Sequence, residues 1–207
     1  IFKSCREFLS QNPIENLHYL VIRHSESTHQ IMLAFVTIGP AKLKNFASFI
    51  QSKHPECISI LHNIKTNISN TILGKETHVL FGKNHINEII SGHKHQVSLH
   101  SFIQPNSVET STLYNEVISA AQLKATDRVL DLYCGIGSIG MACAAHCDHV
   151  VGIDIVEDAI KNAKDNAINN NITNIQFECG AAETIVSQLS DPFDCVITDP
   201  PRKGCHP

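Results

Sequence analysis

The stretch Asp131-Leu-Tyr-Cys-Gly135-Ile-Gly137-Ser-Ile-Gly140 decides the fold of this 207-residue chain. It follows the apolar run Arg128–Tyr133, which predicts a buried strand, and it leads into the apolar segment Ile139–Ala145, which predicts a helix. Glycines at such a turn let the backbone bend tightly and approach a ligand that a Cβ atom would exclude. A glycine-rich turn between a strand and a helix therefore indicates a ligand-binding sheet of the α/β class.

The residues on both sides of this turn alternate between further predicted strands and helices. The predicted strands are Val150–Ile153, Ile175–Phe177 and Cys195–Thr198, and the predicted helices are Val108–Ala121, Glu157–Asn169 and Glu183–Leu189. Strands that alternate with helices form βαβ units and a parallel sheet. We therefore predict that residues 101–207 form a Rossmann-like sheet with its first four strands present, so that the sheet is incomplete where the sequence stops.

Residues 1–100 have a different hydrophobic pattern, with short apolar runs separated by polar residues. The predicted strands are Leu17–Ile22, Ile31–Ile38, Cys57–Leu61, His78–Phe81, Ile86–Ile90 and Gln96–Leu99, with a helix at Ala41–Gln51. This order predicts an α+β module of antiparallel character. We expect two domains, residues 1–100 and residues 101–207.

Composition narrows the class of protein. With 43% hydrophobic and 17% charged residues the chain is globular, and no apolar run is long enough to span a membrane. The eight cysteines form no CxxC pair, which predicts free thiols in a reducing compartment and hence a cytoplasmic protein. Cys143 and Cys147 lack a second ligand pair at metal spacing, so we expect no metal site.

The charges are unevenly distributed. Lysine and arginine exceed the acidic residues in residues 1–100, whereas aspartate and glutamate dominate residues 101–207. This asymmetry suggests an anionic substrate on the first half, although ordinary scatter of surface charge explains it equally well. The densest basic cluster is His93-Lys94-His95, which we expect to be a solvated turn.

Two carboxylates near the glycine turn indicate the kind of ligand. Asp131 would repel a pyrophosphate, but it suits the cationic methionine part of S-adenosylmethionine. Asp154 ends the next predicted strand, where a carboxylate can accept both hydroxyls of a ribose; NAD and S-adenosylmethionine both fit, and a helix cap is the structural alternative. The small residues around Ala181 leave room for an adenine ring, or form a plain turn.

The motif Asp199-Pro200-Pro201-Arg202 follows the last predicted strand. Two prolines fix φ and remove two backbone donors, so they hold a rigid loop at the carboxyl end of a strand, where α/β sheets bind ligands. Asp199 would then face a methyl donor and a flat target ring together. The alternative is a proline-rich turn without a ligand.

Together, Ser101-Phe-Ile-Gln104-Pro-Asn106, the Asp131–Gly137 turn, Asp154 and Asp199-Pro-Pro-Arg202-Lys-Gly204 resemble the RNA (uracil-5-)-methyltransferases. The resemblance covers residues 60–207, and residues 1–60 only loosely. It implies a class I methyltransferase that uses S-adenosylmethionine to form 5-methyluridine in RNA, with ribosomal RNA favoured over transfer RNA as the partner. Residues 1–100 would then lie on the RNA side.

The resemblance also implies roles for particular residues. Asp199 would position uracil and cofactor, and it is the only catalytic candidate. With the residues of the turn, the predicted cofactor-binding set is Gln104, Asp131, Tyr133, Gly135, Gly137, Ser138, Asp154, Ala181 and Asp199. The family's nucleophilic cysteine and basic glutamate fall outside this sequence, so we expect the fragment alone to be inactive; neither Cys5 nor Cys205 lies in the matching motif.

Three alternatives remain open at this point. A NAD-dependent oxidoreductase could use the same glycines, but it gives no role to Asp131 or to the Asp199 loop. A methyltransferase acting on another base position, such as an exocyclic amine, would keep Asp199-Pro200-Pro201 without needing a nucleophilic cysteine. A non-catalytic RNA-binding module could retain the fold alone.

Overall fold

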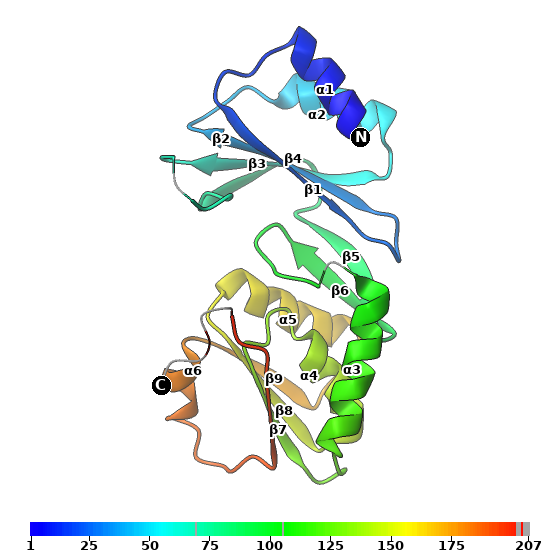
Figure 1. Ribbon diagram of the computed structural model, residues 1–207, viewed down its shortest axis with the longest axis vertical. Helices are drawn as coiled ribbons and strands as arrows, with labels where there is room; N and C mark the ends of the chain where they lie inside the picture. The colour runs from blue at the N-terminus through cyan, green and yellow to red at the C-terminus, as the bar shows by residue number, and fades with distance from the viewer. Residues whose placement is uncertain (69, 105, 202–203, 205–207) are drawn as a thin grey trace. The chain divides into compact units, whose positions relative to one another are not determined.

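The computed structural model describes residues 1–68, 70–104, 106–201 and 204 of the chain (Figure 1). It divides into two compact units, Ile1–Ile86 and Asn87–Pro207. The division therefore lies earlier than the expected boundary after residue 100. The two units are described separately below.

The earlier boundary has a physical cause in the contacts of strand β6 (His93–Ser98) with helix α5 (Glu157–Asn169). The backbone N–H of Gln96 donates to the side-chain oxygen of Asn166 at 2.6 Å. The N–H of Lys94 donates in the same way to Asn170 at 2.9 Å. These bonds tie the segment after residue 86 to the second unit.

The first unit is a four-stranded sheet with two helices. Its elements are α1 (Phe2–Gln11), β1 (Leu17–His24), β2 (Ile31–Ile38), α2 (Lys44–Lys53), β3 (Cys57–Lys65) and β4 (Glu76–Gly82), with strand order β1-β2-β3-β4. The β1–β2 and β3–β4 pairs are antiparallel as expected. The β2–β3 pair is parallel, because α2 crosses over between these strands.

Helix α1 is absent from the sequence-based prediction. It has no side-chain cap and no acidic residue in its first turn, so the usual start signals are missing. Tertiary packing stabilises it instead. The Phe8 ring stacks on Phe46 at 4.6 Å between centroids, and Phe46 lies 4.5 Å from Phe35 of β2. These rings form the centre of the first unit's core.

The second unit contains the predicted parallel sheet. Its remaining elements are β5 (His85–Ile90), α3 (Ser107–Ala121), β7 (Arg128–Leu132), α4 (Ser138–Cys143), the short 3-10 helix η1 (Ala144–His146), β8 (His149–Asp154), β9 (Ile175–Cys179), α6 (Ala182–Val186) and β10 (Cys195–Thr198). Strands β5 and β6 pair separately, and the parallel sheet has the order β10-β7-β8-β9. This is the Rossmann-like α/β arrangement that the alternation of strands and helices predicts.

The strand order creates the ligand-binding edge. From β7 the chain adds β8 and then β9 on one side, whereas β10 pairs with β7 on the other side. The order therefore reverses at β7, and ligands of open α/β sheets bind beside the carboxyl ends of the strands at such a point. The glycine turn and the Asp199 loop follow β7 and β10, so both lie at this edge.

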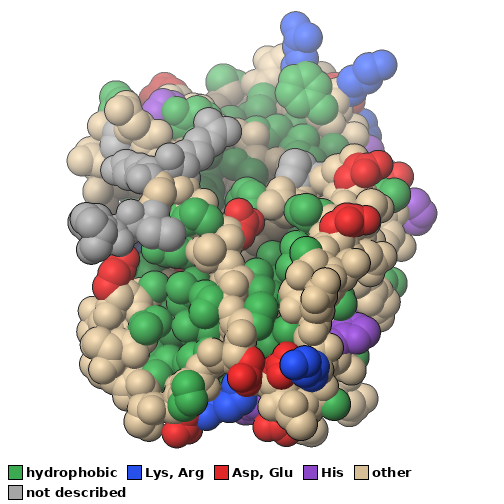
Figure 2. Space-filling model, turned by 60° about the horizontal axis from the view of Figure 1, so that its bottom comes forward, with side chains coloured by type: hydrophobic (Ala, Val, Ile, Leu, Met, Phe, Trp, Pro, Cys, Tyr) green, Lys and Arg blue, Asp and Glu red, His purple; other side chains and the backbone are tan. Residues whose placement is uncertain are grey.

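The second unit has a hydrophobic core between its strands and helices and also carries hydrophobic side chains on its surface. Its β7–β8 core includes Val129, Val150 and Val151, each fully buried. Hydrophobic side chains also gather on the surface shown in Figure 2, with a few acidic side chains among them. Across the described residues, no helix is long and apolar enough to cross a membrane.

The buried face of α5 does not include every apolar residue of the helix. Ala159, Ile160 and Ala163 are buried, but Ile168 is 72% exposed. Asn166 instead lies in the buried stripe, where its amide bonds to the backbone of β6. A polar side chain can occupy a core position when every polar atom finds a partner, and the hydrophobic pattern alone does not reveal this.

Candidate cofactor-binding and active site

Asp131 lies at the back of the candidate site. Its carboxylate is 1% exposed on β7, and its Oδ2 accepts a hydrogen bond from the N–H of Gly140 at 2.9 Å. Burial, with smaller contributions from repulsion by the carboxylates of Asp154 and Asp199, raises the pKa of Asp131 to about 7, and the Gly140 bond opposes that rise. A cationic group nearby would favour the ionised form.

The glycine turn contains three left-handed positions at alternate residues. Tyr133, Gly135 and Gly137 have φ values of 61°, 56° and 77°. A Cβ atom on Gly135 would meet no atom within 4 Å, whereas one on Gly137 would lie 2.5 Å from Cζ of Phe177. Gly135 therefore leaves open space for a ligand, and Gly137 lets the loop pack against the core.

Asp154 holds this turn from the end of β8. Its Oδ2 accepts the N–H of Gly135 at 2.9 Å, and its Oδ1 accepts the N–H of Val156 at 2.8 Å. Asp154 can therefore act as a local cap and also contact a ligand. Each carboxylate oxygen can accept a second hydrogen bond, so both remain able to bind a ribose hydroxyl.

A cavity of about 290 Å³ opens beside Asp154. Tyr133, Ala181 and Pro201 line it, together with apolar side chains that include Ile153 and Ile155. Mostly apolar walls with the carboxylates of Asp154 and Glu183 suit a flat ring joined to a hydroxylated sugar. Ala181 lies at the N-terminal end of α6.

A second, smaller cavity of about 40 Å³ shares Tyr133 with the first. Its lining brings together the remaining sequence-predicted residues at this edge: Gln104, Gly135, Ser138 and Asp199. Of the predicted set, Asp131 lies buried behind the turn, and Gly137 faces the core. Residues from five separate stretches of sequence therefore converge on two adjoining cavities.

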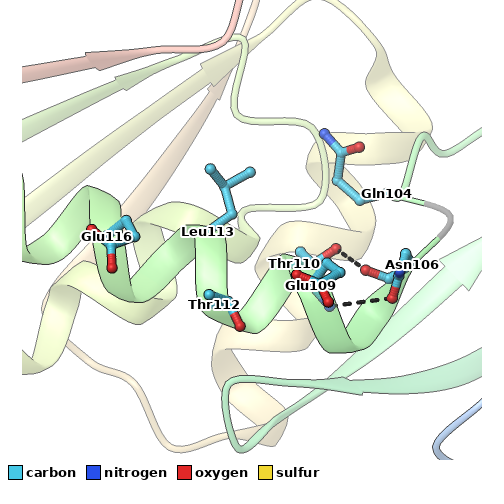
Figure 3. Close-up of a pocket in the computed structure, with 7 residues that line it drawn as sticks. All are labelled: Gln104, Asn106, Glu109, Thr110, Thr112, Leu113 and Glu116. Carbon is cyan, nitrogen blue, oxygen red and sulfur yellow. Dashed lines mark hydrogen bonds between the residues drawn. The ribbon is translucent and has the colours of Figure 1, made fainter.

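A third hollow lies along α3. It measures about 430 Å³, and Figure 3 shows the side chain of Gln104 reaching over the helix toward Leu113. Asn106 caps α3 at this end, since its Oδ1 accepts the N–H of Glu109 at 3.2 Å. Gln104 lines both this hollow and the small cavity beside Asp199.

Several residues near the site escaped the sequence-based prediction. Tyr114 of α3 also lines the small cavity, and its hydroxyl lies 2.6 Å from Oγ of Ser138. Asn162 of α5 donates to Oγ of Ser98 at 2.9 Å and to Oγ of Ser101 at 2.7 Å, which fixes the segment leading to Gln104. Neither residue belongs to a recognisable motif; the only signal was a polar residue at an apolar helical position.

The supposed basic cluster is not a solvated turn. His93, Lys94 and His95 lie in β6, and His95 is fully buried. Burial and, to a smaller extent, the neighbouring His93 lower the pKa of His95 to about 4, so His95 is uncharged at neutral pH. The histidines thus contribute little positive charge to this strand, because a buried imidazole loses the solvation of its charged form.

The structure describes the two cysteines at metal-like spacing but not the basic residues after the two prolines. Cys143 and Cys147 are buried thiols with pKa values raised by burial to about 12 and about 11. Within the described ranges no three histidine, cysteine or acidic side chains form a possible metal cluster. Arg202, Lys203 and Cys205 lie outside the described residues.

Part of the second unit is similar to a known protein family. Residues 123–203 match the family of methyltransferase domains. The sheet has the Rossmann-like fold of solved methyltransferases, and the match implies S-adenosylmethionine as the cofactor. The two cavities fit this molecule, because the apolar one suits adenosine and the carboxylates near the other suit its cationic end. The match gives no support to a NAD-dependent oxidoreductase.

Over most of its length the chain is similar to RNA methyltransferases. It is 40% identical over 195 residues to an uncharacterized RNA methyltransferase of Staphylococcus epidermidis and 38% identical to one of Bacillus cereus. Each alignment covers 91% of this chain and 42% of the relative. The chain thus spans less than half the length of these relatives.

Solved structures agree with the fold. The tRNA (uracil-54, C5)-methyltransferase of Pyrococcus abyssi, in complex with S-adenosyl-L-homocysteine, is 28% identical with a TM-score of 0.78 over 99% of this chain and 51% of its own. The M. jannaschii tRNA m1G37 methyltransferase, at 18% identity and a TM-score of 0.54 over 96% of this chain and 58% of its own, shares the fold alone.

Proposed function

We propose that this chain supplies the cofactor-binding part of an RNA (uracil-5-)-methyltransferase, which transfers a methyl group from S-adenosylmethionine to C5 of a uridine. The observation that carries the proposal is Asp199: it follows β10, precedes two prolines and lines the same small cavity as Gln104 and Ser138. The likeness to the P. abyssi uracil-54 enzyme supports the choice of uracil over other bases.

The two cavities divide the cofactor between them. The adenosine part occupies the 290 Å³ cavity, with its ribose hydroxyls on Asp154 and its ring beside Ala181. The methionine part reaches the 40 Å³ cavity, which Asp199 lines, and the carboxylates of Asp199 and of Asp131, buried behind the turn, stabilise its positive charges. Low polarity around a buried carboxylate strengthens this attraction. NAD fits less well, since its pyrophosphate would face these carboxylates.

The reaction at C5 needs groups beyond this chain's own site. C5 of uracil is a weak nucleophile, and a thiolate that adds at C6 makes it reactive toward the methyl group. A general base then removes the C5 proton and the thiolate leaves. We assign neither group to a residue of this sequence. Asp199 would hold the uracil ring in line with the methyl donor, after the base has left its RNA stack.

The RNA substrate is a separate question. The expectation that ribosomal RNA is preferred stays a prediction, and the solved relative acts on transfer RNA. The natural polypeptide that carries this sequence should be incubated with radiolabelled S-adenosylmethionine and with ribosomal and transfer RNA transcripts. Nuclease digestion and mass spectrometry would then identify the modified nucleoside.

The expected product is 5-methyluridine, and Asp199→Asn should abolish its formation while the exposed Asp158→Asn leaves it unchanged. Label in N1-methylguanosine or in an exocyclic amine would refute the uracil assignment and favour a methyltransferase acting on another base position. Cofactor binding without transfer to any RNA would favour the non-catalytic module.

A further inference from the structure

Tyr114 and Ser138 make a contact within the small cavity that no motif explains. Tyr114 is 4% exposed on α3, and its hydroxyl lies 2.6 Å from Oγ of Ser138, the first residue of α4. Both side chains line the cavity that contains Asp199. A hydrogen bond this short between two hydroxyls, one of them almost fully buried, fixes the orientation of both.

Either hydroxyl can donate in the Tyr114–Ser138 contact. Burial raises the pKa of Tyr114, the bond to Ser138 opposes the rise, and the carboxylates of Asp131 and Asp199 raise it further. The phenol therefore keeps its proton and has one proton to give. When Tyr114 donates it to Ser138, the Ser138 hydroxyl retains its own proton for a different acceptor.

The methionine part of the cofactor offers such an acceptor. Its carboxylate is the one negative group on a ligand whose other charges are positive, and it must enter a cavity bordered by protein carboxylates. A neutral hydroxyl donor compensates part of the resulting repulsion, because hydrogen bonds to charged acceptors are stronger than those between neutral groups. Ser138 is suited to this role only if its proton is free.

We propose that Tyr114 is a positioning residue that donates to Ser138, so that the Ser138 hydroxyl donates to the carboxylate of the cofactor's methionine part. The inference rests on the proposed cofactor site. It also gives α3 a role in that site: the helix begins at the Asn106 cap, two residues after Gln104, and the Tyr114 bond joins it to the glycine turn.

The test separates the two ends of the cofactor. S-adenosylhomocysteine contains the methionine-derived carboxylate, whereas 5′-methylthioadenosine lacks it and keeps the adenosine. Both should be titrated calorimetrically into the natural polypeptide that carries this sequence and into Tyr114→Phe and Ser138→Ala. Each variant should bind S-adenosylhomocysteine about fivefold to tenfold more weakly, the range for one lost hydrogen bond, with 5′-methylthioadenosine unchanged.

The double variant should bind S-adenosylhomocysteine no more weakly than whichever single variant binds it more weakly. Both changes break the same chain of hydrogen-bond donors, so their effects do not add. Tyr19→Phe, which removes a phenol hydroxyl in the first unit, is the matched control and should bind both ligands normally. Equal weakening of both ligands in Tyr114→Phe, or no weakening, overturns the positioning role. If the wild-type protein binds neither ligand, the proposed cofactor site itself is refuted.

Discussion

The N–H of Gly140 donates to Oδ2 of Asp131 at 2.9 Å and so gives the buried carboxylate a backbone hydrogen-bond partner. A Cβ atom on Gly140 would lie 3.0 Å from the same oxygen. The third glycine of the turn therefore lets the start of α4 approach Asp131 closely. This contact only partly offsets burial, and the pKa of Asp131 remains raised to about 7.

Cofactor binding should depend on pH through Asp131. The ammonium group of S-adenosylhomocysteine favours the ionised carboxylate, so binding releases a proton at any pH below the free enzyme's pKa of about 7. We expect the affinity to rise by up to about tenfold per pH unit below that pKa and to level off above it. Calorimetry in buffers of different ionisation enthalpy measures both the affinity and the proton release.

Asp131→Asn is the control for this dependence, because it keeps an acceptor for Gly140 and cannot ionise. Its affinity should be lower and nearly independent of pH across the neutral range. An unchanged pH profile in this variant would assign the titration to another group.

Protein stability should show the opposite trend with pH. Asp131 ionises near pH 3.8 in the unfolded chain but only near pH 7 in the folded one, so the folded state holds the extra proton between these values. The contribution of Asp131 to the free energy of unfolding is greatest below the lower pKa and falls as pH rises to about 7. Urea unfolding of wild type and Asp131→Asn across this window should show a steeper fall for wild type; parallel curves would contradict the raised pKa.

Two glycines of the turn should respond differently to substitution by alanine. Gly137→Ala places a Cβ atom 2.5 Å from the Phe177 ring at a φ of 77°, so we expect a loss of about 2–4 kcal/mol in the free energy of unfolding. Gly135→Ala meets open space and should cost only about 1 kcal/mol through its φ of 56°.

Urea unfolding measures this difference, and cofactor titration provides the complementary readout. Gly135→Ala should weaken S-adenosylhomocysteine binding despite its small effect on stability, because its Cβ atom enters the space left for the ligand. Equal stability of the two variants would mean that the turn relaxes around Phe177.

Asp154→Ala should impair recognition of the nucleoside end. The change removes the acceptor for Gly135 and Val156 as well as the proposed ribose contact, so adenosine and S-adenosylhomocysteine should both bind at least tenfold more weakly. Asp158→Ala, on the exposed first turn of α5, is the matched control and should bind normally. Binding of NAD to the wild-type protein in the same titration would contradict the methyltransferase assignment.

Local patterns predicted much of the second unit. The runs that became β7, β8 and β10 were apolar and short, and the glycines between β7 and α4 stand where φ is positive. Residues in different motifs, such as Asp154 and Ala181, could be assigned to one ligand because parallel strands end at the same edge of a sheet. The same patterns missed α1, whose stability comes from its aromatic contacts with α2.

The sequence by itself determined the alternation of strands and helices, the glycine turn and the carboxylates at the strand ends, because periodicity and backbone preference are properties of neighbouring residues. Only the tertiary structure decided that Asp131 is buried against Gly140, that Asp154 holds Gly135, and that Tyr114 meets Ser138. Burial and hydrogen bonding of this kind depend on how helices pack on the sheet. That packing sets the pKa of Asp131 and the direction of the hydroxyls, and no local pattern encodes it.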